Sequence, residues 1–505
     1  MPAVPLPDNP SLEQLRKQAK DVRDLARAGV PGALDLVAAH HPGGRNPVGL
    51  AGAQLVVARH YGFTSWARLK RHLEIVEHYR RVPDEVAQPD GLADEFLALA
   101  CLRYGDDAPA RWERAARLLA DQPGIARSSI HVAAAVADGA AVRALLQDDP
   151  ALAGSQSGPY GWEPLLYLTY ARHDPAVSET ATLGTARLLL EHGADPNAGY
   201  LWHGLIPPFT ALAGALGSGE GDQPEHPHAF ALASLLLDAG ADANDGQVLY
   251  NRQFGADDRH LVLLLDHGLG HGDGGPWRAR LGHTMDSPAE LLRVQLWWAI
   301  VHDLRDRVRL LVARGADFRS PFQVSGGRPS WARTSDGRTP AEVAALAGCP
   351  EVAEWLVTQG AVRPAGAGAD GLIAAVLAGD RATARRLRAH AGTARAQRPG
   401  LIVWAAARRS SDAIVLLAEL GFDVNALGRT DIPMEQAWET ALHEAAAHGD
   451  VQMARLLVDL GADPDIKDTR FDSTPLGWAR HFGQQATIDF LQPLTRPEVA
   501  ATPGS

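Results

Sequence analysis

The chain has 505 residues, of which 46% are hydrophobic and 21% charged, a composition typical of folded globular proteins rather than disordered chains. Its net charge of −12 argues against a dedicated DNA-binding protein. The two cysteines, Cys101 and Cys349, exclude a disulfide framework and any four-cysteine zinc site. No apolar run reaches the roughly 18 residues of a membrane helix. The start lacks the features of a signal peptide, so we expect a cytoplasmic location.

The first 82 residues carry the pattern of a helical module. Ser11 opens a capping box, and apolar residues then recur at helical spacing until Gly29 ends the helix. Tyr61-Gly62 ends a later helix, and Phe63-Thr64-Ser65-Trp66 begins the next. We therefore expect helices from 12 to about 28, over about 32–40, over 50–60 and from 66 onward.

Charge is distributed unevenly between this module and the rest of the chain. Residues 1–82 hold 12 Lys and Arg against 7 Asp and Glu, whereas the remainder holds 36 against 53. Two interpretations stay open: a structural cap on the following domain, which is favoured, or a basic module that docks an acidic partner. The basic residues expected on its first helix are Arg16, Lys17, Lys20, Arg23 and Arg27.

Beyond the module, one phrase recurs along the chain. It consists of an apolar run, two variable residues and Gly-Ala-Asp, and it is clear at 188–199, 235–246 and 456–468. A Thr-Pro or Thr-Ala-Leu-His phrase precedes it, most fully in residues 439–465. Threonine caps a first helix, glycine ends a second one, and Asp and Asn then form a tight turn. One such helix pair cannot bury its apolar face alone, so copies must stack.

These phrases resemble the ankyrin repeat, whose signature begins with Thr-Pro-Leu-His and ends with Gly-Ala-Asp-x-Asn. The resemblance implies an all-α ankyrin solenoid of ten or eleven helix pairs over residues 92–494, followed by a disordered tail at 495–505. It also implies that His443 bonds the backbone of a turn. Residues 53–74, AQLVVARHYGFTSWARLKRHLE, resemble the N-terminal ends of bacterial ankyrin-repeat proteins and thus favour a helical cap over 1–82.

Three turns of the array are lengthened into fingers, at 199–209, 319–337 and 426–438. Aromatic residues, Met and Arg make binding hot spots when exposed, so we expect a partner there. The alternative is that each finger folds onto its neighbour and buries its own aromatic side chains. The candidate partner-binding residues are Tyr200, Trp202, His203, Phe209, Phe322, Arg328, Trp331, Arg333, Arg429, Asp431, Met434, Glu435 and Trp438.

The first helices of the pairs should present further side chains to a concave face. We expect Trp297 and Trp404 to be core residues instead. A polar Gly/Pro-rich stretch at 217–229 predicts a mobile solvent loop, and its two histidines lack a third metal ligand. The candidate concave-face residues are Tyr170, His302, Arg408, Arg409 and His448.

Catalytic motifs are missing from the sequence. It has no P-loop and no G-x-S-x-G elbow, and HEAAAH at 443–448 does not have the spacing of a zinc protease. We therefore expect neither cofactor nor metal and favour a binding protein over an enzyme.

The sequence as a whole predicts a protein-interaction scaffold. A partner would bind through the concave face and the fingers, with nucleic acid disfavoured. The alternative is a small-molecule-binding or catalytic groove between the fingers, with a role in specialised metabolism.

Overall fold

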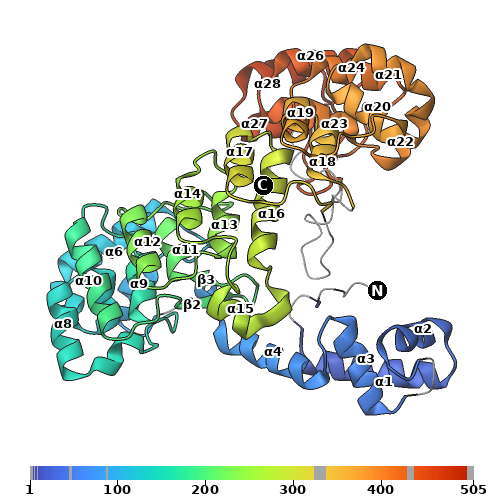
Figure 1. The fold of residues 1–505 in the computed structure, drawn as a ribbon. Helices are drawn as coiled ribbons and strands as arrows, with labels where there is room; N and C mark the ends of the chain where they lie inside the picture. The colour runs from blue at the N-terminus through green and yellow to red at the C-terminus, as the bar shows by residue number, and fades with distance from the viewer. Residues whose placement is uncertain are drawn as a thin grey trace. The chain divides into compact units, whose positions relative to one another are not determined.

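The computed structural model describes residues 4, 6–7, 10–44, 48–86, 89–322, 337–428 and 437–496. The described chain is mostly helical, with three short strands (Figure 1). It divides into two compact units, Met1–Gln295 and Leu296–Ser505. Within the described residues, no helix is both long and apolar enough to cross a membrane.

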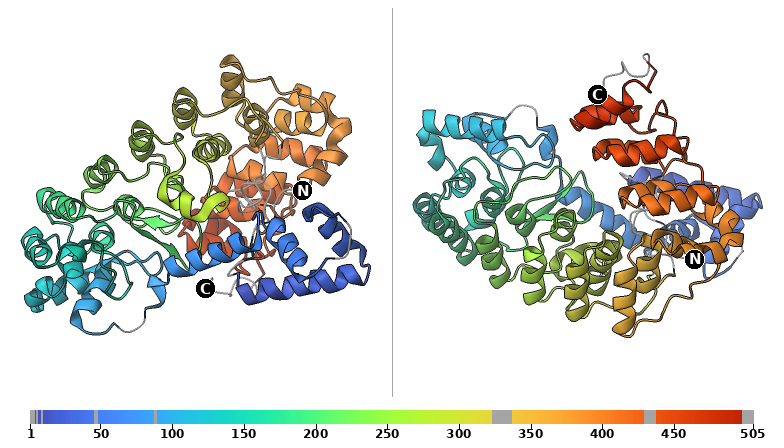
Figure 2. Two further views of the ribbon diagram at one scale, coloured as in Figure 1. Left: turned by 60° about the horizontal axis from the view of Figure 1, so that its bottom comes forward. Right: turned by 90° about the horizontal axis from the view of Figure 1, so that it is seen from above.

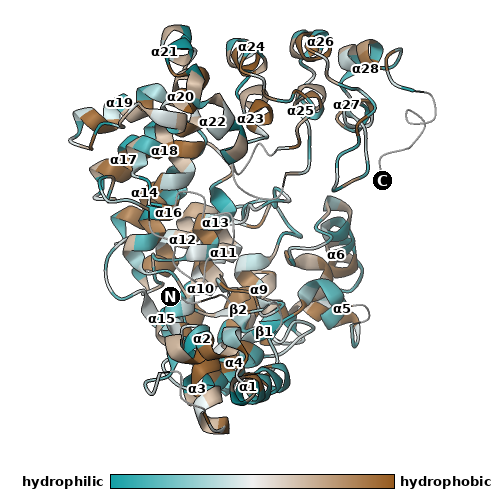
Figure 3. Ribbon diagram, turned by 90° about the vertical axis from the view of Figure 1, so that its right-hand side faces the viewer, coloured by the Kyte–Doolittle hydropathy of each residue, from teal (hydrophilic) through white to brown (hydrophobic). Residues whose placement is uncertain are grey.

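The N-terminal helices form where the sequence predicts them. They are α1 (Leu12–Arg27), α2 (Pro31–His40), α3 (Leu50–His60) and α4 (Trp66–Tyr79). The Ser11 hydroxyl accepts a hydrogen bond from the backbone N–H of Gln14 at 3.1 Å, and Ser65 caps α4 in the same way. Leu15, Val57 and Leu69 share a buried cluster, which packs α1, α3 and α4 together. Figure 3 shows the corresponding pattern, with α1 largely hydrophilic and α3 largely hydrophobic.

Helix pairs follow in the first unit. The first members of successive pairs, α7, α9, α11 and α13, pack side by side, and the second members α8, α10 and α12 do the same. The elements are η1 (Pro83–Glu85), α5 (Leu92–Ala100), α6 (Pro109–Asp121), η2 (Pro123–Arg127), α7 (Ile130–Ala135), α8 (Gly139–Asp148), η3 (Pro150–Gly154), α9 (Pro164–Tyr170), α10 (Glu179–Glu191), α11 (Ala211–Leu216), α12 (Ala229–Asp238), α13 (Gly246–Arg252), α14 (Arg259–Asp266), α15 (Gly275–Leu281) and η4 (Gly282–Thr284).

A small sheet interrupts the helices of this unit. Its strands are β1 (Arg80–Arg81), β2 (Gly199–Trp202) and β3 (Phe209–Thr210), in the order β1-β2-β3. β1 runs parallel to β2, with Arg80 opposite Leu201, whereas β3 is antiparallel to β2. The left view of Figure 2 shows the strands alongside α4.

The second unit repeats the helix pairs. α23, α25 and α27 pack in sequence, and α26 packs against α28. Its elements are α17 (Arg305–Ala313), α18 (Pro340–Ala347), α19 (Pro350–Thr358), α20 (Gly368–Leu377), α21 (Arg381–Arg386), η6 (Arg388–His390), α22 (Ala391–Gln397), α23 (Leu401–Ala407), α24 (Ser411–Glu419), α25 (Ala441–Ala447), α26 (Val451–Asp459), α27 (Pro475–His481) and α28 (Gln485–Leu491), and α16 (Pro288–Val301) leads into it from the first unit.

Two asparagines, Asn197 and Asn425, each connect their own turn to the turn of the following helix pair. Asn197 donates through Nδ2 to Gly240 O at 3.0 Å and accepts from the Asp242 N–H at 2.8 Å. Asn425 makes the same two bonds in the second unit, to Gly461 O at 3.1 Å and from Asp463 N at 2.8 Å. Equivalent bonds in both units explain why Asn follows Gly-Ala-Asp in the recurring phrase.

His443 occupies the position expected of it. Its Nε2 lies 2.9 Å from Ser473 O, and its Nδ1 accepts from the Thr440 N–H at 3.2 Å. This pair of bonds requires the neutral ring with the proton on Nε2. Burial lowers the pKa of His443 to about 4, which keeps the ring in that form at neutral pH.

Candidate functional site

The first finger, residues 199–209, buries part of its aromatic content. Tyr200 is 2% exposed and Phe209 8%. The Tyr200 ring centroid lies 4.9 Å from that of Trp162 and 5.6 Å from that of Phe209. Tyr170, expected on the concave face, is fully buried beside them, and its hydroxyl donates to Thr210 O at 3.0 Å. These three side chains belong to the core, so we no longer assign them to a partner-binding surface.

Trp202 and His203 extend from the same finger and are partly exposed. The Trp202 indole N–H donates to Arg103 O at 3.2 Å. His203 Nε2 lies 2.9 Å from both carboxylate oxygens of Asp84, and the His203 N–H donates to Arg81 O at 2.9 Å. Residues 80–85 of the same chain therefore contact the first finger through hydrogen bonds.

An apolar cluster holds this contact together. Leu201, Trp277 and Leu281 are buried, and Val76 and Tyr79 of α4 pack against them. The rings of Tyr79 and Trp277 meet edge to face with centroids 4.8 Å apart. Helix α4 thus covers both the first finger and α15 (Figure 1). The surface that the sequence predicts for a partner is partly occupied by the N-terminal module.

Two histidines lie where this module meets η4. The Phe63 ring centroid is 5.0 Å from that of His72 and 4.6 Å from that of His283. His72 is 6% exposed, and its Nδ1 has no hydrogen-bond partner among the described residues. Burial, with a smaller contribution from His283, lowers the pKa of His72 to about 4. Charging this ring would therefore oppose the contact.

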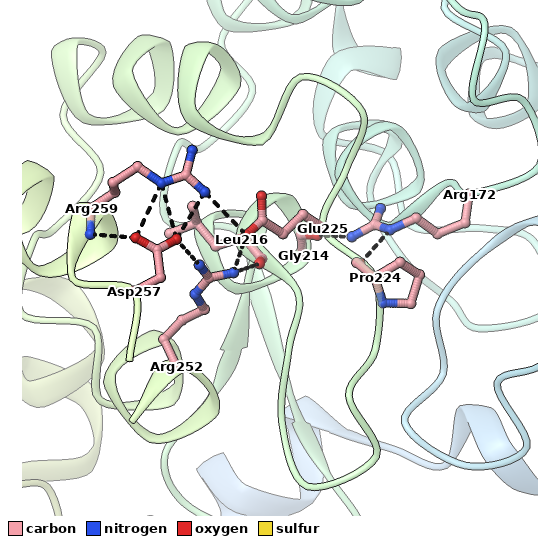
Figure 4. A network of polar contacts seen from close by, with 8 residues as sticks. All are labelled: Arg172, Gly214, Leu216, Pro224, Glu225, Arg252, Asp257 and Arg259. Atoms are coloured by element: carbon pink, nitrogen blue, oxygen red, sulfur yellow. Dashed lines mark hydrogen bonds and ion pairs between the residues drawn. The ribbon is translucent and has the colours of Figure 1, made fainter. Parts of the chain in front are cut away.

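The loop at 217–229 is held by buried arginines (Figure 4). Arg172 donates to Pro224 O at 2.9 Å and to Gly214 O at 2.6 Å. Arg252 donates to Leu216 O at 3.2 Å and pairs with Glu225. The expectation of a mobile solvent loop rests on composition alone and does not anticipate these bonds to distant residues.

The histidines of this loop are not arranged as a metal site. His226 is 4% exposed, and burial lowers its pKa far below the ordinary value. His228 Nε2 bonds Val177 O at 2.6 Å, which ties the loop to the insertion at 171–184. Within the described ranges, no group of three or more His, Cys, Asp or Glu is placed to hold a metal ion.

A small hollow lies beside the first finger. It is lined by Asn197, Thr210, Asp242, Asp245 and Trp277 among others, and its volume is about 20 Å³. Burial raises the pKa of Asp245 to about 6, but this carboxylate caps α13 through the N–H groups of residues 247 and 248. The space matches about one water molecule. It therefore gives no support to the alternative of a metabolite-binding groove.

In the second unit, aromatic residues of successive turns form an exposed surface. Phe471 and Phe482 are each 53% exposed. The Trp438 ring lies 5.6 Å from Phe471 and 5.1 Å from Trp478, and the Arg470 guanidinium lies 5.6 Å from the Trp438 centroid. The Trp478 ring lies 6.3 Å from that of Phe482. We call Trp438, Arg470, Phe471 and Phe482 the aromatic patch.

Asp468 builds the turn that presents Phe471. Its carboxylate accepts from the backbone N–H groups of Arg470 and Phe471 and from the Trp478 indole at 3.0 Å. The Thr469 N–H donates to Trp438 O at 2.9 Å. These bonds fix Phe471 and Trp438 to the same turn, so the aromatic patch is held in place before a partner binds.

The remaining concave-face candidates differ in their surroundings. Arg408 lies 4.9 Å from the ring of Trp404, a core residue as expected, and donates to Val301 O. Arg409 is exposed. His448 is half exposed, and its Nδ1 lies 3.1 Å from Glu444 O. Only Arg409 and His448 present much of their side chains to solvent, while His302 is half-buried and stacks on Trp298 at 3.9 Å.

The second and third fingers are only partly described. Phe322 is 8% exposed and pairs through its backbone with Arg338, which closes the base of the second finger. Phe322 is thus a core residue and is no longer assigned to a partner-binding surface. The candidates Arg328, Trp331, Arg333, Arg429, Asp431, Met434 and Glu435 lie outside the described residues.

Sequence reasoning missed Phe471, Phe482 and Arg470. A usable signal was present, because Phe471 follows the Asp-Pro-Asp turn at 463–465 as the fingers follow other turns. The turn is short, however, and only the lengthened turns were singled out.

An ankyrin repeat family model matches residues 438–469. The matched segment contains His443, the turn at 461–463 to which Asn425 bonds, and one member of the aromatic patch, Trp438. The match supports an ankyrin-repeat protein, and such repeats suggest a role in protein–protein interaction.

Proposed function

We propose that this chain is an ankyrin-repeat scaffold that binds a partner protein through the aromatic patch of its second unit. Ten or eleven helix pairs between residues 92 and 494 would form the repeats, with the N-terminal module bracing the first finger rather than closing an end. The asparagine bonds repeated at Asn197 and Asn425 support this architecture.

The observation that carries the proposal is the exposure of Phe471 beside Trp438 and of Phe482 beside Trp478. Large aromatic side chains are normally buried, and an exposed group of them with an arginine is typical of interaction sites. Trp438 lies in the matched segment, and Asp468 ties the turn of Phe471 to the Trp478 indole, so the framework of the patch is rigid. Binding would then cost little ordering entropy.

Site-specific photocrosslinking tests this function. A photoreactive phenylalanine analogue at position 471 should crosslink one defined protein in cell extract, and the same analogue at the exposed Val362 should not. Adding Phe482→Ala to the position-471 variant should abolish the crosslink, because losing a hot-spot aromatic weakens binding by about 2 kcal/mol or more.

Phe254, 45% exposed in the first unit, supplies the matched control. The variant Phe254→Ala should leave the crosslink from position 471 intact. Equal crosslinking from positions 471 and 362, or insensitivity to Phe482→Ala, would reject the aromatic patch as the binding surface.

A further inference from the structure

A second surface of the same unit is rich in arginine. Residues 381–411 contain eight arginines and neither Asp nor Glu, although acidic residues outnumber Lys and Arg by 60 to 48 in the whole chain. The arginines lie mainly on α21, η6 and α22, three short helices that all pack against α20.

Several of these arginines serve the fold. Arg381 pairs with Asp412 on α24 at 2.8 Å. Arg395 donates to Leu420 O at 3.1 Å and to Gly421 O at 3.0 Å, at the end of α24. Arg398 and Arg408 likewise donate to backbone carbonyls and lie near the ring of Trp404.

Arg385, Arg386 and Arg388 have no such role. All three are exposed, and none pairs with a carboxylate in the part of the chain that the structure describes. Arg386 donates only to the Thr383 hydroxyl of its own helix, at 3.2 Å. We call these three residues the arginine cluster.

The stability of α21 does not account for the arginine cluster. A helix C-terminus favours a positive charge, and Arg385 and Arg386 lie in the last turn. Three like charges within four residues nevertheless repel one another, which destabilises the helix. The Asp380 carboxylate accepts from the Thr383 N–H and lies within electrostatic reach of Arg386, but residues 381–411 themselves contain no acidic residue.

We propose that the arginine cluster binds a carboxylate-rich segment of a partner protein. Guanidinium groups present paired N–H donors that match a carboxylate in bidentate geometry. A short acidic segment needs only the three positive charges of the cluster. A nucleic acid extends well beyond the cluster, and its phosphates are repelled by a chain of net charge −12. This surface is independent of the aromatic patch, and its test does not depend on that patch.

Binding of a labelled octapeptide of alternating Glu and Ala to the full chain tests this inference. Fluorescence anisotropy at about 50 mM salt would compare the wild type with Arg385→Gln/Arg386→Gln/Arg388→Gln. Glutamine keeps the helix propensity of arginine, so the fold should persist, and circular dichroism verifies it. Because exposed ion pairs are individually weak, we expect the loss of three of them to weaken binding roughly tenfold.

The matched control removes the same charge elsewhere. Arg117→Gln/Arg143→Gln/Arg187→Gln alters three exposed arginines on α6, α8 and α10, and it should bind the acidic peptide as the wild type does. A peptide of alternating Gln and Ala should not bind.

Three results would overturn the inference: no binding of the acidic peptide to the folded wild type, equal loss in both triple variants, or tighter binding of single-stranded DNA through the same three arginines.

Discussion

Replacing Arg172 by methionine should release the loop at 217–229 without unfolding the first unit. Arg172 donates to four backbone carbonyls, those of Thr169, Ala171, Gly214 and Pro224, at 2.6–3.0 Å. Burial lowers the pKa of its guanidinium to about 10, so the charged form is disfavoured by about 3 kcal/mol. Four bonds from a charged donor contribute at least about 1.5 kcal/mol each. The bonds therefore outweigh the burial of the charge by about 3 kcal/mol.

Hydrogen exchange measured by mass spectrometry gives the local free energy that this prediction requires. A chain with two compact units need not unfold in one step, so the midpoint of global unfolding is a poor measure of the local stability of this loop. In Arg172→Met, amides of residues 214–229 should exchange about a hundredfold faster. Cleavage by a Glu-specific protease at Glu220 and Glu225 should accelerate in parallel.

Arg187→Met provides the control, because Arg187 is exposed on α10. It should leave exchange of the loop unchanged. Loop protection in Arg172→Met that matched the wild type would refute the reasoning, since the remaining contacts of the loop, including those of Arg252, would then suffice.

Three further outcomes are expected. His72 has a folded pKa of about 4 against an ordinary 6.5, so its contribution to stability is complete above pH 6.5 and is lost as the pH falls toward 4. The total loss is about 3 kcal/mol, and it should vanish in His72→Gln; acid titrations that coincide for the two proteins would contradict this. Trp277→Ala should lower the free energy of unfolding by about 3–5 kcal/mol and expose α4 to proteolysis, because Trp277 belongs to the apolar cluster that α4 covers. Unchanged proteolysis of α4 would show that other contacts hold the N-terminal module. Asn425→Ala should cost about 1–3 kcal/mol in the second unit alone, measured by exchange at residues 461–463, and equal effects in both units would count against a local bond.

Local features of the fold were predictable from the sequence. The bounds of α3, Leu50–His60, agree with the prediction, because Gly49 before it and Tyr61-Gly62 after it act locally. Thr339 forms the capping box of α18 with Glu342, and Pro340 occupies the first turn. His443 could be interpreted correctly since its partners, Thr440 and Ser473, recur with the repeat.

The rest depends on contacts between residues that are far apart in the sequence. Arg80-Arg81 has no strand pattern and becomes β1 only because β2 offers its edge. Composition describes residues 217–229 as polar but carries no sign of Arg172 or Arg252. Tyr200 resembles a surface hot spot in sequence, and its burial follows from Trp162, a residue of a preceding turn. The ankyrin match covers residues 438–469, and the domain boundaries expected at 82 and 92 remain a prediction.

The pairing of β1 with β2 has a consequence for synthesis on the ribosome. Most helix pairs contact their immediate neighbours, so they can fold as they emerge. Arg80 and Arg81, in contrast, must wait until residues 201–202 have been translated, and α4 must wait for α15 at 275–281. Until then, Val76 and Tyr79 of α4 lack the apolar surface that later covers them. The N-terminal module is thus made before the rest of the first unit, yet it reaches its final contacts only after residues 275–281 have been translated.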